Sequence, residues 1–365
     1  MDRNFVYEAR GPGKAVVDQS IQGRDRDRQN PSRQKVTVLI SSAGRRVGLM
    51  NLFRESGDKL GLDLRVLASD MDPALSSACR VADRSFRMQA CNSAGYVDAL
   101  IELCGQNQVD LVVPTIDPEL EILAKAQRDG RFGATRIAVS DPGTIALVRD
   151  KLASSVHLTR WGIPVPKTVP AADALASADS WTWPLFAKRI SGSRSVGAKV
   201  VRDPDSLRVF MAEHPDLIVQ EVCIGREYTV NLYIDLQGVL RSIAAHLRIE
   251  VRDGEVSKGV TVRDSRLEDL ARALVQAIPG LRGPVCFQAF MEDARQRLPR
   301  VTDINARFGG GYPLSHAAGA EFTTFLLAEQ AGLDWDWGPV AFREGVVMLR
   351  YDAAVFVPPE ASKAT

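Results

Sequence analysis

The chain lacks the features that mark membrane, secreted and nucleic-acid-binding proteins. No apolar run approaches the roughly 20 residues that cross a bilayer, and the N-terminus has no secretory apolar core, so we expect a cytoplasmic protein without membrane contact. The 46 basic residues nearly balance the 45 acidic ones, which gives no global field for nucleic acid. We therefore expect small-molecule partners.

Metal-binding and nucleotide-loop patterns are also absent. The five cysteines contain no C-x-x-C pair and the four histidines show no metal-ligand spacing, which argues against a disulfide framework and a zinc site. There is no G-x-x-x-x-G-K-[ST] loop. The first strand-to-helix loop, with Ala43 and Gly44, lacks G-x-G-x-x-G, so a nicotinamide oxidoreductase is the weakest candidate function.

A length of 365 residues predicts two to three packed units. Residues 1–35 are polar and without periodicity, which is typical of a flexible arm. From Val36, short apolar runs alternate with amphipathic segments, and this β-α-β series predicts a doubly wound parallel sheet. The expected strands include 36–40, 64–68, 111–113 and 137–139, and the expected helices 47–60, 96–104 and 119–126.

Three loops follow the carboxyl ends of these strands, where such sheets bind ligands. They are 41–46, 70–73 and 114–119. Arg45 and Arg46 would suit an anionic substrate beside a helix N-terminus. The alternative is that these are ordinary turns in which Ser42 or Asp117 caps a helix.

A helix expected over 144–160 ends at a glycine and two prolines, 162–166, which indicates a domain junction. A strand then ends in Lys188 before the polar loop 191–197, whose backbone could approach phosphates; a simple hairpin turn is the alternative. Further on, Glu221 and Glu227 bracket a glycine bend and could hold ribose hydroxyls while the backbone between them pairs with an adenine edge.

The segment 301–311 carries Asp303, Asn305 and Arg307 at alternate positions before three glycines. Alternate side chains of a strand share a face, so the three would converge. Carboxylate and amide oxygens suit Mg²⁺, which proteins hold with one or two groups plus nucleotide phosphates. A solvent-facing polar edge strand is the alternative.

The order of these motifs over about 36–319 resembles the ATP-grasp superfamily, and within it a single synthetase unit of the carbamoyl-phosphate synthase large subunit and its shorter relatives. The resemblance implies an α/β chain in which the N-terminal doubly wound parallel sheet, a pre-ATP-grasp domain, precedes a two-lobed α+β ATP-grasp domain. It implies an arm at 1–35, a Rossmann-like domain at 36–143, the nucleotide-binding and catalytic domain at 144–350 and a tail at 351–365.

The resemblance also assigns roles to single residues. Arg307, Lys188 and Lys258 match positions near the transferred phosphoryl group. Gln288, Asp303 and Asn305 match the magnesium ligands. The nucleotide-binding positions are Lys151, Lys188, Ser193, Ser195, Gln220, Glu221, Val222, Cys223 and Glu227. His246 lies in the region near the γ-phosphate, with its role open.

Such a protein would use ATP and Mg²⁺, or Mn²⁺ in its place, to join a carboxylate to an amine, as an enzyme of biosynthesis. Attack of the carboxylate on the γ-phosphoryl group gives an acyl phosphate and ADP, and the amine then displaces phosphate. Candidates for contacting the carboxylate or amine are Arg45, Arg46, Asp117 and Glu119, with 313–316 bordering that pocket. Many relatives are dimers, so a homodimer fits.

Two other functions remain open. One is a carbamoyl-phosphate-synthase-like phosphotransferase, against which the chain holds one synthetase unit and no evident glutamine-hydrolysing domain with a nucleophilic cysteine. The other is a non-enzymatic nucleotide-sensing module, against which the metal and phosphate residues are intact. The substrate pair cannot be predicted from the sequence.

Overall fold

The structure, a computed structural model, describes residues 33–192, 197–292, 298–334 and 342–357. Apart from Arg33, these residues belong to one compact unit, Gln34–Thr365. The arm expected at 1–35 lies almost wholly outside the described residues, as do Ser193 and Ser195 of the glycine/serine loop and residues 358–365 of the expected tail. No helix of the described ranges is long and apolar enough to span a bilayer.

A five-stranded parallel sheet opens the described chain, in the order β3-β2-β1-β4-β5. Its central strand β1 is buried except at its first residue, because helices cover both faces of the sheet. This confirms the parallel sheet expected from the apolar runs. The strands are β1 (Lys35–Ser41), β2 (Asp63–Asp70), β3 (Arg84–Arg87), β4 (Leu111–Pro114) and β5 (Arg136–Ile137).

Alternate residues of β1 enter two separate cores. Val38 and Ile40 pack with Phe53 of one helix, and Leu39 packs with Leu100 of another on the opposite face. Successive side chains of a strand point to opposite faces of the sheet, so its apolar residues contribute alternately to the two cores. The helices of this part are α1 (Val47–Lys59), α2 (Ser77–Val81), α3 (Tyr96–Asn107) and α4 (Asp117–Arg128).

The single helix expected over 144–160 is wrong, because the chain forms two helices, α5 (Pro142–Arg149) and α6 (Lys151–Arg160). Asp150 between them has an extended backbone, and its carboxylate accepts the amide hydrogens of Leu152 and Ala153. Asp150 is therefore an N-cap, a role that the periodicity of the surrounding apolar residues hides.

A small antiparallel sheet follows, in the order β6-β9-β7-β8. One face buries Leu185, Ala187 and Val219 against two helices. The elements are β6 (Thr168–Pro170), α7 (Ala171–Ala176), the 3₁₀ turn η1 (Ala178–Ser180), β7 (Leu185–Arg189), β8 (Lys199–Val201), α8 (Pro204–Glu213) and β9 (Leu217–Glu221).

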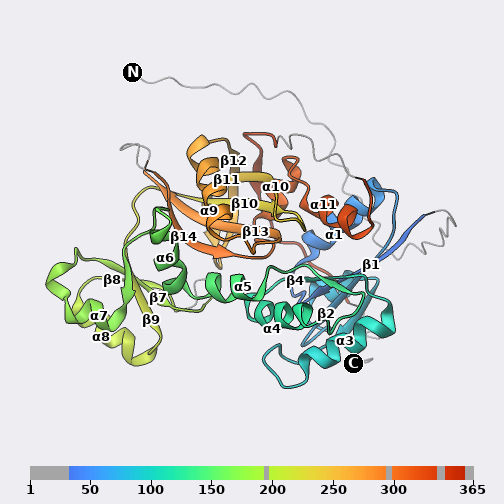
Figure 1. Cartoon of the computed structure of the whole chain (residues 1–365), viewed down its shortest axis with the longest axis horizontal. Helices are drawn as coiled ribbons and strands as arrows, with labels where there is room; N and C mark the ends of the chain where they lie inside the picture. The colour runs from blue at the N-terminus through green and yellow to red at the C-terminus, as the bar shows by residue number, and fades with distance from the viewer. Residues whose placement is uncertain (1–32, 193–196, 293–297, 335–341, 358–365) are drawn as a thin grey trace. The chain divides into compact units, whose positions relative to one another are not determined.

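The third sheet is antiparallel, in the order β14-β13-β10-β11-β12-β15, and helix α9 packs on β10 and β11 (Figure 1). Alternate residues of β10 and β13, such as Val230 and Phe287, fill the core beneath that helix. The elements are β10 (Arg226–Ile234), β11 (Leu240–Arg252), β12 (Glu255–Val262), α9 (Ser265–Ala277), β13 (Gly283–Met291), β14 (Arg300–Asn305) and β15 (Val347–Leu349).

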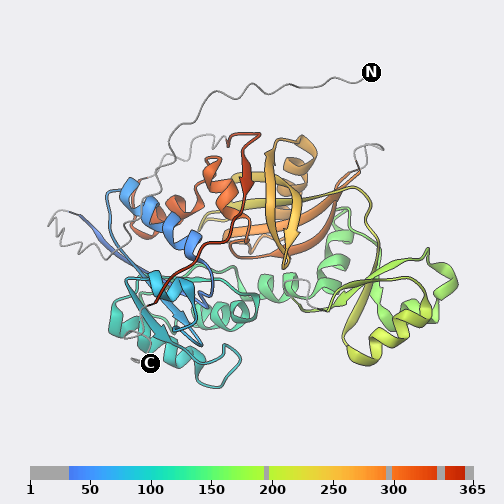
Figure 2. The ribbon, with the colours of Figure 1, turned by 180° about the vertical axis from the view of Figure 1, so that it is seen from behind.

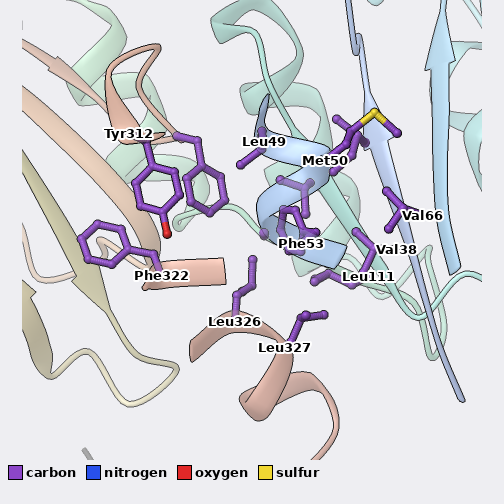
Figure 3. Close-up of a cluster of buried hydrophobic side chains, with 14 of the residues drawn as sticks. Val38, Leu49, Met50, Phe53, Val66, Leu111, Tyr312, Phe322, Leu326 and Leu327 are labelled. Atoms are coloured by element: carbon purple, nitrogen blue, oxygen red, sulfur yellow. The ribbon is translucent and has the colours of Figure 1, made fainter. Parts of the chain in front are cut away.

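Two late helices, α10 (Tyr312–Ala317) and α11 (Phe322–Gln330), return to the first sheet. Both pack against α1 (Figure 2). Figure 3 shows Leu326 and Leu327 of α11 facing Phe53, in the same apolar core as Val38 of β1. The core of the N-terminal sheet is thus completed by residues some 270 positions later in the chain.

Candidate functional site

A cavity of about 480 Å³ collects most of the residues that the sequence singled out. Its walls come from the two antiparallel sheets, from Arg46 before α1, from residues 115–117 after β4, from the start of α6 and from the glycine turn 309–311. The lining includes the predicted residues Lys151, Lys188, Gln220, Glu221, Val222, Cys223, Glu227, Gln288, Asp303, Asn305 and Arg307.

The predicted metal ligands lie on neighbouring strands. Gln288 of β13 stands opposite Asp303 of β14, and the Asn305 amide donates to the Asp303 carboxylate at 3.1 Å. Within the described ranges, no group of three His, Cys, Asp or Glu side chains could hold a metal by itself. One carboxylate and two amides fit a Mg²⁺ ion that takes its remaining ligands from water and phosphates.

Two lysines converge beside Asp303. The Lys151 ammonium lies 3.3 Å from the Asp303 carboxylate and donates to the Gly192 carbonyl at 2.9 Å, at the start of the glycine/serine loop. Lys188, 8% exposed, donates to the Thr302 carbonyl at 2.9 Å, where the register between β13 and β14 shifts. Both point charges therefore face the same carboxylate from different elements.

Burial lowers the pKa of Lys188 to about 8, with the Asp303 charge opposing and Lys151 adding to this shift. We expect ADP affinity to weaken above pH 8, because the free protein then loses the charge that attracts phosphate. Well above pH 8, the affinity for ADP should fall by about tenfold per pH unit. Calorimetric titration of ADP between pH 7 and 9.5 measures it, with Lys188→Arg as the charge-preserving comparison. Equal pH profiles for both proteins would contradict the assignment of Lys188 to the phosphates.

The predicted hinge begins at Glu221, the last residue of β9. Gln220 is buried and donates to Thr168, while Glu221 is half exposed and accepts from Arg300 at 3.2 Å. Gly225 has φ 113°, and a Cβ there would lie 2.2 Å from the Met291 carbonyl oxygen. Only glycine permits this close approach. The bend thus carries Glu227 to the cavity at the start of β10.

Arg248 is a cavity residue that the sequence analysis missed. Its side chain, 7% exposed, lies 3.1 Å from the Glu227 carboxylate and donates to Thr229 at 3.2 Å. Burial raises the pKa of Glu227, and the Arg248 charge opposes this shift. No motif marks Arg248, because it is one of several charged residues along β11; only the pairing of β11 with β10 brings it to Glu227.

Arg307 reaches the cavity from beyond the end of β14. Its guanidinium forms two hydrogen bonds of 2.8 Å to the Asp117 carboxylate at the start of α4, and a third of 3.2 Å to Asn305. Burial lowers the pKa of Arg307, but the Asp117 charge raises it, and the net pKa is raised. Asp117, expected to contact a substrate, lines the same cavity and also holds Arg307 in place.

Several expected site residues lie outside the cavity lining. The Lys258 ammonium is paired with Glu250 at 2.7 Å and is half exposed, because its position on β12 turns it away from the cavity. Glu119 is fully buried and accepts hydrogen bonds from Ser42, Tyr96 and the backbone of Thr115, so it braces the start of α4. Residues 313–316 form part of α10 and are largely buried.

His246 is also outside the cavity lining, with no exposed surface on β11. Its Nδ1 lies 3.4 Å from the Asn231 amide, and its Nε2 has no hydrogen-bond partner among the described residues. Burial, together with the charges of Arg248 and Arg350, lowers the pKa of His246 to about 3. The imidazole is therefore neutral at physiological pH.

This depressed pKa predicts an acid-sensitive contribution to stability. The unfolded chain binds the proton near pH 6.5 and the folded chain only near pH 3, so stability is complete above 6.5 and falls as the pH drops. Between pH 6.5 and 5 the loss from this residue is about 2 kcal/mol. Urea unfolding across this range should show a smaller loss for His246→Gln than for wild type or the His214→Gln control. A uniform loss in all three would exclude the effect.

The chain matches two protein-family models. Residues 38–138 match the PylC-like N-terminal domain, and residues 148–311 match the ATP-grasp domain. Together they span most of the first sheet and of the cavity-forming region. No curated protein sequence matches the chain.

Solved structures share the fold at low sequence identity. The biotin carboxylase domain of Hydrogenobacter thermophilus 2-oxoglutarate carboxylase, in complex with MgADP, has a TM-score of 0.66 at 14% identity over 84% of this chain and 72% of its own. N5-carboxyaminoimidazole synthetase of Staphylococcus aureus with ADP gives 0.62 at 17% identity over 83% and 79%. The L-amino acid ligase of Bacillus licheniformis gives 0.61 at 16% over 82% and 75%. These likenesses show the fold.

Proposed function

Because the chain belongs to the ATP-grasp superfamily of ADP-forming ligases, we propose that it joins a carboxylate to an amine at the expense of ATP. The bond formed is an amide or peptide bond, through an acyl phosphate, with release of ADP and phosphate. The domain limits at 36–143 and 144–350 belong to the same proposal.

One observation carries the proposal. Lys151, Lys188 and Arg307 come from different elements, and all three line one cavity with the Gln288, Asp303 and Asn305 ligand set. Three cations around one carboxylate and two amides match a polyphosphate with a bound Mg²⁺ ion. The sequence motifs alone did not require these side chains to share one cavity.

The cavity residues fit MgATP in their chemistry. Gln220 to Cys223 border an apolar wall that contains Phe186, Val200 and Phe290, which suits a purine ring. Glu227 can accept hydrogen bonds from ribose hydroxyls. When bound at Asp303, Mg²⁺ would neutralise charge on the nucleotide phosphates. The biotin carboxylase domain with MgADP is a protein of the same fold.

The chain's own side chains supply positioning and charge. Lys188 is desolvated, so its charge acts on phosphate oxygens with little screening by water. Arg307 is held rigid by Asp117, which suits a group that must meet the transferred phosphoryl without reorganising. Formation of the acyl phosphate breaks the bond between the γ-phosphorus and its bridging oxygen, and ADP leaves with that bond's electrons. The amine then displaces phosphate from the acyl carbon and loses a proton.

The proposal is tested by ADP release with MgATP across a crossed panel of carboxylates and amines. We expect release that needs one member of each class. It should be lost in Lys188→Met and retained in Lys125→Met, whose lysine forms an exposed pair with Glu121 on α4. Release with a carboxylate alone would instead favour the phosphotransferase alternative, and AMP as product would overturn the acyl-phosphate route. Nucleotide binding without turnover in any pair would favour a sensing module.

A further inference from the structure

Arg248 is a buried cation of the cavity that has no role in the proposed function. Its side chain is 7% exposed and lies 3.1 Å from the Glu227 carboxylate. The guanidinium also donates to the Thr229 hydroxyl and to the Gly254 carbonyl, both at 3.2 Å. All four residues line the cavity. The guanidinium is therefore held from three directions, which fixes the carboxylate that it faces.

Glu227 lies where the sugar of a bound nucleotide is expected. On β10 it stands opposite Phe290, which belongs to the apolar wall that suits a purine ring. Thr229, two residues further along the same face, stands opposite Gln288 of the predicted metal set. Two residues of a strand span about 7 Å, a distance that a ribose and its attached phosphate can bridge. The expected base, sugar and phosphate positions thus follow one another along β10.

The Glu227 carboxylate can still accept hydrogen bonds from a ligand. Its side chain is 24% exposed, and within the described ranges it has no ion-pair partner other than Arg248. A carboxylate has two oxygens and about four lone-pair sites, so the contact with Arg248 leaves acceptor sites for hydroxyl groups. The nearby cation also favours the ionised form of the acid, which accepts hydrogen bonds and does not donate them.

From this arrangement we propose that Arg248 makes the cavity selective for a ribonucleotide over a deoxyribonucleotide, by holding the Glu227 carboxylate at the ribose hydroxyls. Arg248 acts through Glu227 and is thus a positioning residue. The inference rests on the nucleotide binding that the proposed function includes. It does not depend on which carboxylate and amine the protein joins.

The selectivity requires a carboxylate that stays charged and in one place. Without the guanidinium, Glu227 would be a partly buried acid with no partner, and such a group takes up a proton or turns toward water. In either state it accepts hydrogen bonds from the sugar less well. A hydrogen bond to a fixed, charged group contributes about tenfold or more to affinity, so its loss is measurable.

Calorimetric titration of the full chain with Mg²⁺ present compares ADP with 2′-deoxy-ADP and 3′-deoxy-ADP. We expect the wild-type protein to bind at least one deoxy analogue about tenfold more weakly than ADP. This preference should be lost in Arg248→Met. A change that only loosens the sheet would weaken all three nucleotides alike and keep the preference. An unchanged preference in Arg248→Met, or none in the wild-type protein, would overturn the proposal.

Three further variants complete the design. Glu227→Ala should also lose the preference, and adding Arg248→Met should change it no further, because the two side chains act through one contact. Arg248→Lys should keep part of it, since lysine retains the charge but not the bonds to Thr229 and Gly254. Arg252→Met removes an exposed arginine of the same strand and is the control. A preference retained in Glu227→Ala would contradict the role of this carboxylate.

Adenosine separates this role from a direct contact between Arg248 and phosphate. Loss of the sugar contact should weaken adenosine and ADP by the same factor, whereas loss of a phosphate contact weakens ADP alone. Weaker ADP binding with unchanged adenosine binding in Arg248→Met would therefore overturn the proposal.

The inference and the proposed function can fail separately. ADP binding with a preference that does not depend on Arg248 would refute the positioning role and leave the ligase standing. Selective ribonucleotide binding that depends on Arg248, without ADP release from any substrate pair, would leave the positioning role standing and refute the ligase. A wild-type protein that binds no ADP would refute both.

Discussion

Asp303→Asn is expected to reduce ADP release by about 10³-fold, equivalent to about 4 kcal/mol of transition-state stabilisation. Asp303 is the one carboxylate of the proposed metal set, beside the amides of Gln288 and Asn305. It also lies 3.3 Å from Lys151 and is the main charge that raises the pKa of Lys188. An amide keeps the shape and removes the charge, so the metal and both lysines lose their common partner.

The measurement is ADP release as a function of Mg²⁺ concentration, with Asp205→Asn as the control. Asp205 is exposed at the start of α8 and lies away from the cavity. Recovery of part of the rate at high Mg²⁺ is expected, because the lost ligand mainly weakens metal affinity. A rate within threefold of wild type at every Mg²⁺ concentration would remove Asp303 from the metal site.

Arg307→Lys is expected to lower kcat by about 10²- to 10³-fold with a smaller change in the KM for ATP. The Arg307 guanidinium makes two parallel bonds to Asp117, one to Asn305 and one to the Phe308 carbonyl. A lysine keeps the charge but cannot form this planar set, so it would not hold a fixed position. The loss should therefore appear in turnover rather than in nucleotide binding.

Asp117→Asn is the matched partner of this experiment. It keeps Arg307 but weakens the contact that fixes it, so we expect a loss of kcat of about tenfold, between wild type and Arg307→Lys. The double variant should have a kcat only slightly lower than that of Arg307→Lys alone, because the two side chains act through one contact. A raised KM with unchanged kcat in Arg307→Lys would show that this arginine serves binding alone.

The sequence brings together those cavity residues whose neighbours are local. Asp303 and Asn305 are two apart on one strand, and the Gly225 bend lies between Glu221 and Glu227, so local geometry alone brings each pair to the same cavity. The parallel sheet was confirmed for the same reason, since its strands are short apolar runs separated by helices.

Contacts between distant segments could not be predicted in this way. Arg248 depends on the register of β11 against β10, and Asp117 meets Arg307 across 190 residues. Glu255, a cavity-lining residue at the start of β12, forms ion pairs with Arg46 and Arg350, and no sequence motif predicts either contact. Lys258 is the converse case: strand alternation at β12 sets its side chain toward Glu250 and outside the cavity lining, and a shift of one residue along the strand would reverse the side that it faces.

The packing of α11 on α1 has a consequence for the order in which the chain matures on the ribosome. Phe53 and Val38 are synthesised early, but Leu326 and Leu327, which cover the same core, are synthesised some 270 residues later. At synthesis rates of about 5–20 residues per second, the apolar face of α1 waits on the order of tens of seconds for its cover. During that interval the apolar face of α1 is exposed to solvent. We therefore expect chaperones to bind the nascent chain most before residue 330 is translated.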